Sequence, residues 1–124
     1  MDFSTEQLWA FLPRGYLLTI TIEIPILLIG LSSCHSFRRR VVAGFWLTAC
    51  TYPVVILVLP LTVGVWWGRL AYLVTAEIFA PIAECLLFRV AFPIPVRRGN
   101  AVRDMAAITA ANLGSFVFGY WMYE

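Results

Sequence analysis

Three glutamates stand inside otherwise apolar stretches of this 124-residue chain: Glu23, Glu77 and Glu84. A charged side chain near the centre of a lipid bilayer costs about 2.5 to 3.5 kcal/mol on insertion scales. Each glutamate is therefore expected to face protein or trapped water and to find hydrogen-bond partners or remain protonated. Carboxyl groups held in this way can hand protons to one another or replace the hydration shell of a small cation.

The depth of each glutamate follows from the helical rise of about 1.5 Å per residue. Counted from the expected span boundaries, Glu23 and Glu77 lie about 12 and 10 Å below the outer boundary. Glu84 and Asn112 lie about 12 and 10 Å above the inner boundary. The sequence therefore predicts a ladder with two polar levels. The second expected span adds three hydroxyl side chains to this ladder, with Thr48 at the inner level and Thr51 and Tyr52 in the middle.

Prolines recur in the same apolar stretches. Pro81 has no N–H, so the carbonyl of Glu77, four residues earlier, loses its helical partner and can accept from water, an ion or a neighbouring helix. Pro25 and Pro53 free carbonyls in the same manner. We expect helix kinks at these three prolines, with the freed oxygens adding to the ladder.

The elements that hold these groups are indicated by composition. The chain is 61% hydrophobic and 13% charged, whereas soluble domains carry roughly 25% charged residues. This excludes a soluble enzyme, a disordered tail, a disulfide-rich secreted module and a coiled coil. The length allows a single membrane domain over residues 1–124.

Four spans of about 20 residues fit the pattern of polar interruptions. We predict an all-α integral membrane protein, a four-transmembrane-helix up-and-down bundle, with spans at about 15–34, 41–61, 70–92 and 105–123. Ser4 and Gln7 form a capping box, which predicts a short N-terminal interfacial helix that ends at Pro13. Asp104 is the expected N-cap of the last span.

Arginine fixes the expected orientation, because loops rich in basic residues stay in the cytoplasm. All nine basic residues are arginine, and seven of them fall at one side of the predicted bundle. Both termini are then outside the cytoplasm, and eight of the ten Trp and Tyr residues lie at the outer face. Arginine without lysine suggests a bacterial plasma (inner) membrane. The residues expected to contact anionic lipids are Arg38, Arg39, Arg40, Arg97 and Arg98.

Small residues recur every four positions in the last span, at Ala107, Ala111, Ser115 and Gly119. Such a row lets membrane helices approach closely. It predicts a helix-packing face, used within the bundle or toward a partner. A bundle of this size has little interior for a wet path, so we expect a homo-oligomer or a subunit of a larger membrane complex.

Other chemistry has little support in the sequence. Cys34 and His35 are adjacent, so they do not face one another on a helix, and His35 is expected to be an interfacial residue. The usual ligand motifs of zinc, di-iron, haem and iron–sulfur centres are missing, although a carboxylate-only metal site stays open. We predict no cofactor, no catalytic residue and no nucleic-acid partner.

Three functions fit these residues. The first is a proton or cation pathway formed by the intramembrane carboxylates, as in a channel or transporter. The second is a structural or assembly subunit, in which the same carboxyls are hydrogen-bond anchors between helices. The third is an intramembrane hydrolase with Glu77 and Glu84 as acid–base or metal groups.

Overall fold

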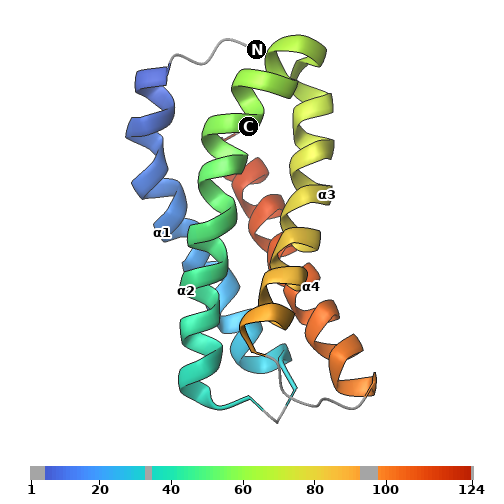
Figure 1. Cartoon of the computed structure of the whole chain (residues 1–124). Helices are drawn as coiled ribbons and strands as arrows, with labels where there is room; N and C mark the ends of the chain where they lie inside the picture. Colours follow the sequence, from blue (N-terminus) through green and yellow to red (C-terminus); the bar gives the residue numbers. More distant parts are fainter. Residues whose placement is uncertain (1–4, 33–34, 93–97, 124) are drawn as a thin grey trace.

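The computed structural model describes residues 5–32, 35–92 and 98–123. These residues form helices and short connections, and no strand occurs among them. The all-helical fold class is therefore confirmed. The helices are α1 (Thr5–Gly30), α2 (Phe37–Pro53), α3 (Val65–Ala91) and α4 (Arg98–Tyr123), with two π-helical stretches, η1 (Val54–Val58) and η2 (Pro60–Gly64), between α2 and α3 (Figure 1).

The count of separate helices differs from the prediction. Residues 37–91 are one continuous helical segment, so the described chain has three helical segments where four helices were expected. Pro53 and Pro60 have no N–H to donate to the preceding helical turn. A wider π-helical stretch follows Pro53 and another begins at Pro60, and the chain stays helical through both. The direction of the chain reverses near Gly68, whose backbone has φ 89° and ψ 178°. Glycine adopts this conformation without a Cβ clash.

The predicted N-terminal interfacial helix is not a separate element. Helix α1 begins at Thr5 and continues through Pro13 and Pro25 to Gly30. A proline removes one helical hydrogen bond, and in an apolar setting the remaining bonds favour continuing the helix. Pro81 likewise lies inside α3, and the bends expected at Pro25, Pro53 and Pro81 stay predictions. Ser4, the expected cap, lies outside the described residues.

The elements pack as an antiparallel bundle. Helices that follow one another in the chain pack together: α1 on α2, α2 on α3, and α3 on α4. Helix α4 also packs on α1, so the four helices form a closed ring. The chain reverses at the upper end of Figure 1, where α3 begins, and the last turns of α1 and α3 lie at the lower end. We call these the upper and lower ends of the bundle.

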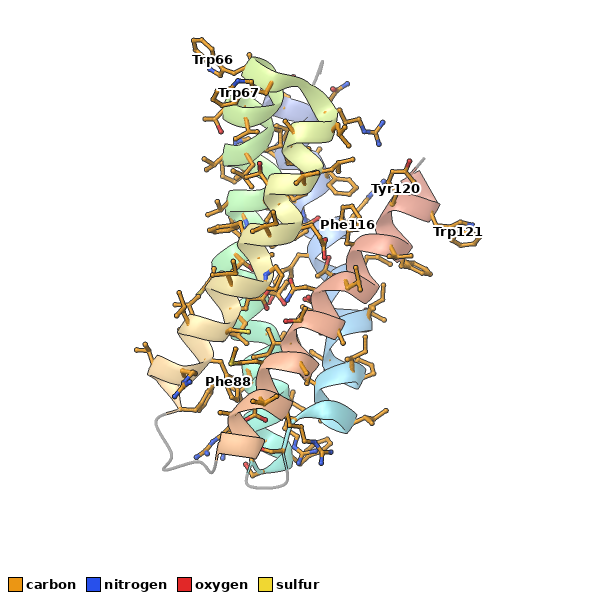
Figure 2. All side chains as sticks on the ribbon, turned by 90° about the vertical axis from the view of Figure 1, so that its right-hand side faces the viewer. Trp66, Trp67, Phe88, Phe116, Tyr120 and Trp121 are labelled. Atoms are coloured by element: carbon orange, nitrogen blue, oxygen red, sulfur yellow. The ribbon has the colours of Figure 1, made fainter. Side chains whose placement is uncertain are left out.

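Two helical stretches, Glu6–Gly30 and Phe37–Ala91, are long and apolar enough to cross a membrane. Many large apolar side chains on them point away from the protein, including Ile29, Leu70 and Val90, which are 80%, 77% and 78% exposed. Trp66 and Trp67 lie at the upper end, and Tyr120 and Trp121 lie in the same half, whereas Phe88 lies in the lower half (Figure 2).

A compact apolar layer fills the lower half of the bundle. It is a single cluster of buried side chains from all four helices: Leu27, Leu31, Ala43, Leu47, Phe88, Ala107, Ile108 and Ala111. The small residues of α4 pack against α1 here, because a Cβ added to Gly30 would lie 2.9 Å from the Cβ of Ala107. Ala107 and Ala111 of the predicted packing face are therefore inside the bundle, and Ser115 and Gly119 line a cavity above them.

Candidate functional site

A cavity of about 230 Å³ lies above the apolar layer, between the four helices. It is lined by every residue of the predicted polar ladder: Glu23, Thr48, Thr51, Tyr52, Glu77, Glu84 and Asn112. Aromatic side chains from all four helices form much of its upper wall: Phe11, Tyr52, Tyr72, Phe116 and Tyr120. The structure thus brings the expected residues to one space, and their role as a pathway remains a prediction.

Glu23 is held between two neighbouring helices. The residue is only 2% exposed although its side chain ends in a carboxyl group. The hydroxyl of Thr48 on α2 donates to Oε2 at 2.8 Å, and the hydroxyl of Ser115 on α4 contacts Oε1 at 3.5 Å. Both oxygens therefore face neutral hydroxyl groups. The sequence pattern assigned Ser115 only to the helix-packing face. That pattern depends on the small size of the residue and says nothing about where its hydroxyl donates.

Glu84 is held in the same way from α3. The residue is 3% exposed, and the hydroxyl of Thr51 on α2 donates to its Oε2 at 3.3 Å. The side chain of Asn112 on α4 also hydrogen-bonds to it, while the Asn112 amide donates to the carbonyl of Ile108 at 2.9 Å. Glu84 therefore has one partner on each of two adjacent helices.

The two buried carboxyls share one level, which corrects the predicted ladder. Glu23 binds Thr48, which was placed at the inner level, and Glu84 binds Thr51, which was placed higher. The first span was expected to end at residue 34, but α1 ends at Gly30. Glu23 lies seven residues before the end of α1, and Glu84 lies seven residues before the end of α3 at Ala91. At the helical rise of about 1.5 Å per residue, both carboxyls lie roughly 10 Å above the lower helix ends. We call this set the carboxylate layer: Glu23, Thr48, Thr51, Glu84, Asn112 and Ser115.

Glu77 occupies a different environment. It is two turns above Glu84 on α3, lines the cavity and is half-buried. It is therefore not the level partner of Glu23 that was predicted. It lies on the upper side of the carboxylate layer, where its side chain is more open than the two buried carboxyls.

Tyr52 and Tyr72 shape the upper cavity. A Cβ on Gly15 of α1 would lie 1.5 Å from the Tyr52 hydroxyl oxygen. The missing side chain at Gly15 therefore makes room for the Tyr52 phenol. The Tyr72 hydroxyl donates to the carbonyl of Val55, inside the π-helical stretch, at 2.9 Å. Sequence reasoning missed Tyr72, which was assigned only to the aromatic belt.

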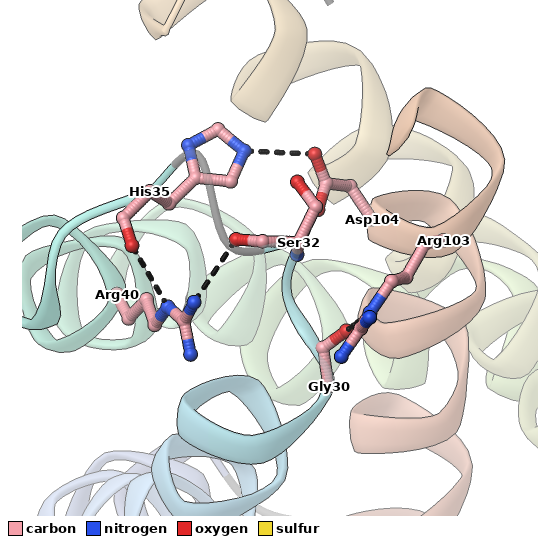
Figure 3. A network of polar contacts seen from close by, with 6 residues as sticks. All are labelled: Gly30, Ser32, His35, Arg40, Arg103 and Asp104. Carbon is pink, nitrogen blue, oxygen red and sulfur yellow. Dashed lines mark hydrogen bonds and ion pairs between the residues drawn. The ribbon is translucent and has the colours of Figure 1, made fainter. Parts of the chain in front are cut away.

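A second polar cluster lies below the apolar layer, and we call it the basal network: the buried Ser32, His35 and Asp104, the half-buried Arg40 and the exposed Arg103 (Figure 3). Asp104 Oδ2 contacts His35 Nε2 at 2.8 Å, and its Oδ1 accepts from the Ser32 amide at 2.7 Å. The expectation that Asp104 caps α4 is wrong, since α4 already begins at Arg98. His35 is 3% exposed and is therefore not interfacial.

The carbonyls at the end of α1 explain why arginines join this network. Arg40 donates from Nη2 to the Ser32 carbonyl at 3.0 Å and from Nε to the His35 carbonyl at 3.1 Å, and it also binds the Leu28 carbonyl. Arg103 donates to the Gly30 carbonyl at 3.0 Å. Carbonyls in the last turn of a helix lack helical partners, and cations stabilise that end.

The predicted lipid-contacting arginines therefore divide. Arg40 is half-buried and bound to backbone carbonyls, and its contact with lipid stays a prediction. Arg39 lies over the ring of Phe92, with its guanidinium carbon 5.4 Å from the ring centroid. Arg38 is exposed, and its contact with anionic lipids stays a prediction. Arg97 and the side chain of Arg98 lie outside the described residues.

The described residues contain no group of three or more His, Cys, Asp and Glu side chains that could hold a metal ion. In the carboxylate layer the carboxyl oxygens already face hydroxyl and amide groups. This arrangement is suited to holding a proton on the carboxyls.

Comparison with protein families, with curated proteins and with solved structures gave no match to this chain. The function is therefore argued from the site alone.

Proposed function

We propose that this chain is a multi-pass membrane protein whose carboxylate layer takes up protons from the upper side of the bundle. The observation that carries the proposal is that Glu23 and Glu84 are both at most 3% exposed and yet border a cavity of about 230 Å³. Buried carboxyls beside open volume are the arrangement expected of a proton pathway in a membrane protein.

The membrane setting is supported by the outer surface of the bundle. Ile29, Leu70 and Val90 are each at least 77% exposed, and a surface rich in such side chains is poorly suited to water. We propose four passes, with the reversal at Gly68 separating the second from the third. The arginine-rich lower end faces the cytoplasm and anionic lipids, and both termini lie outside.

Protons are favoured over metal cations at this site. Both oxygens of Glu23 face hydroxyl groups, at 2.8 and 3.5 Å, so a metal ion would have to displace these partners. A proton needs only one oxygen lone pair, and a hydroxyl can both donate and accept. A hydroxyl beside each carboxyl can therefore adjust to either protonation state.

The cavity is closed below by the apolar layer, so a single static chain is not an open channel. Leu31 and Leu47 in that layer are 0% and 1% exposed. We infer that passage requires a change of conformation, as in a transporter, and that oligomeric contacts or a host complex can supply it.

Proton flux into proteoliposomes tests the proposal. The purified chain is reconstituted with a pH-sensitive dye inside and flux is driven by a potassium diffusion potential. We expect Glu23→Gln and Glu84→Gln to lower the flux at least tenfold, because glutamine keeps the shape and loses the exchangeable proton. Glu6→Gln, on the exposed upper turn of α1, is the matched control and should keep the wild-type rate.

One observation favours a second candidate, a structural subunit. Each buried carboxyl is bound by neutral groups from two other helices, which is how interhelical hydrogen bonds join membrane helices. This role predicts no wild-type flux and glutamine variants that behave as wild type. That result would remove the proton pathway and leave the anchor.

A further inference from the structure

The basal network contains a buried atom that the proposed pathway does not yet use. The residue His35 is 3% exposed, and among the described side chains its Nδ1 is the buried polar atom without a hydrogen-bond partner. The other ring nitrogen, Nε2, is 2.8 Å from Asp104. Natural proteins pair nearly all buried polar atoms, so an unpaired one calls for a role.

The pairing is incomplete in either charge state of the ring. A neutral His35 that donates from Nε2 to Asp104 leaves Nδ1 as an empty acceptor. A protonated His35 leaves an N–H at Nδ1 with nothing to receive it. The ring is thus held by one nitrogen and keeps the other available, which is the arrangement of a group that accepts and releases a proton.

The charges around the ring have opposite signs. Asp104 on α4 favours the imidazolium, whereas Arg40 on α2 and Arg103 on α4 place positive charge in the same network. The amide of Ser32, which follows α1, donates to the same Asp104, and from α3 the ring meets the uncharged Phe88. Charged groups of both signs therefore lie in the network around the ring.

Phe88 links this site to the carboxylate layer. It follows Glu84 by four residues, so both side chains lie on one face of α3, one turn apart. The Phe88 ring meets the His35 ring edge-on, with centroids 5.0 Å apart. One layer of apolar side chains therefore separates the two sets of titratable groups.

We propose that His35 is a second proton-binding site, on the lower side of the apolar layer, with Phe88 as the barrier between it and Glu84. When the layer opens, water connects the two sites, and the proton of the Glu84 carboxylic acid passes to Nδ1 of neutral His35. This leaves a carboxylate above and an imidazolium paired with Asp104 below. The imidazolium then releases the proton to water at the lower end. This inference rests on the proposed function.

Two substitutions at His35 separate a proton site from a structural contact. His35→Gln keeps a side-chain N–H for Asp104 and has no exchangeable ring proton, and His35→Ala has neither. A proton site predicts that both variants lose flux at least tenfold, with the glutamine variant keeping the wild-type unfolding midpoint. A structural contact predicts wild-type flux for the glutamine variant, which would overturn the inference.

A measurement on the unmodified chain covers the case in which both variants misfold. His35 is the only histidine, so ¹⁵N-histidine labelling gives one pair of ring signals. We expect the Nδ1 signal to move from the unprotonated to the protonated position as the pH is lowered, while the Nε2 signal keeps its proton. An Nδ1 signal that stays in one form throughout would overturn the inference.

The failures of the two proposals are distinguishable. If the Glu23 and Glu84 variants lose flux and His35→Gln does not, the pathway stands and the histidine site is wrong. If the glutamate variants keep full flux, the pathway itself is wrong, whatever the histidine signals show.

Discussion

The carboxylate layer and the basal network are both buried polar clusters in one apolar bundle, yet they are built differently. In the carboxylate layer the acidic groups face neutral hydroxyls and amides and border a cavity of about 230 Å³. In the basal network the charged groups face each other and the backbone: Asp104 uses both oxygens, and Arg40 binds three carbonyls.

This difference indicates which cluster holds the fold together. Arg40 and Arg103 satisfy carbonyls at the end of α1, and Asp104 joins α4 to the residues that follow α1. Loss of any of them leaves buried groups unpaired. The carboxyls of the upper layer accept weaker, neutral bonds beside open space, so the fold should depend less on them. Four substitutions test this contrast by their effect on stability.

The largest loss is expected for Asp104→Ala. It leaves the Ser32 amide and His35 Nε2 without their acceptor in a buried site. Leaving a buried donor without its acceptor typically costs about 1 to 3 kcal/mol, and this substitution removes the acceptor of two such groups. Equilibrium unfolding in detergent micelles measures it. Arg38→Ala, at an exposed neighbouring position, should change stability by less than about 0.5 kcal/mol. A loss for Asp104→Ala no larger than this control would remove the structural role of the network.

Arg40→Lys should have the next largest effect, about 1 to 3 kcal/mol of lost stability. An ammonium is a single centre and cannot reach the three carbonyls that Nε, Nη1 and Nη2 bind together. Each unpaired buried carbonyl costs about 1 to 3 kcal/mol, less what lysine and water recover. The same unfolding assay measures it. A lysine variant as stable as wild type would show that charge alone, and not the guanidinium fork, holds the end of α1.

The sequence predicts the upper cluster well and the lower one poorly, for physical reasons. Acidic residues inside apolar stretches are costly, so their inward orientation follows from composition alone. All seven ladder residues accordingly line the cavity. Their levels were wrong because the expected boundary of the first span was four residues beyond Gly30, and one helical turn shifts a side chain by about 5.4 Å.

The basal network was missed because its residues look ordinary at the end of a span. A histidine beside arginines resembles an interfacial loop, and an aspartate before an apolar run resembles a helix cap. Only the tertiary contact between the end of α1 and the side of α4 shows that Asp104 binds Ser32 and His35, 72 and 69 residues away in the chain. The one available signal was the presence of Arg40 after the first predicted span and of Asp104 before the last one. Opposite charges near two span ends could have indicated a contact between them.

Thr48→Val should have a smaller effect than either basal substitution. Valine has the shape of threonine and removes the hydroxyl that donates to Glu23 at 2.8 Å. Hydrogen bonds between membrane helices average about 0.6 kcal/mol, with a maximum of about 1.7 kcal/mol, so we expect a loss of about 1 kcal/mol. Thr21→Val, at an exposed position of α1 whose hydroxyl donates to the Leu17 carbonyl of its own helix, is the control. A Thr48 loss above about 3 kcal/mol would make the upper layer as structural as the lower one.

Glu84→Leu should change stability least, by less than about 1 kcal/mol in either direction. Replacing a buried ionisable group by an apolar one of similar volume is often neutral or stabilising, because its desolvation is removed along with its bonds. Leucine would leave Thr51 with its second partner, the Leu47 carbonyl at 3.1 Å, and Asn112 with the Ile108 carbonyl. The variant should therefore fold as wild type and yet conduct no protons. Asp104→Leu, the same exchange in the basal network, should lose several-fold more stability, since both carboxyl oxygens of Asp104 are bound, one to the Ser32 amide at 2.7 Å and one to His35 Nε2 at 2.8 Å. Equal losses for the two leucine variants would mean that both clusters serve the fold, and the glutamates would then need no other function to explain their burial.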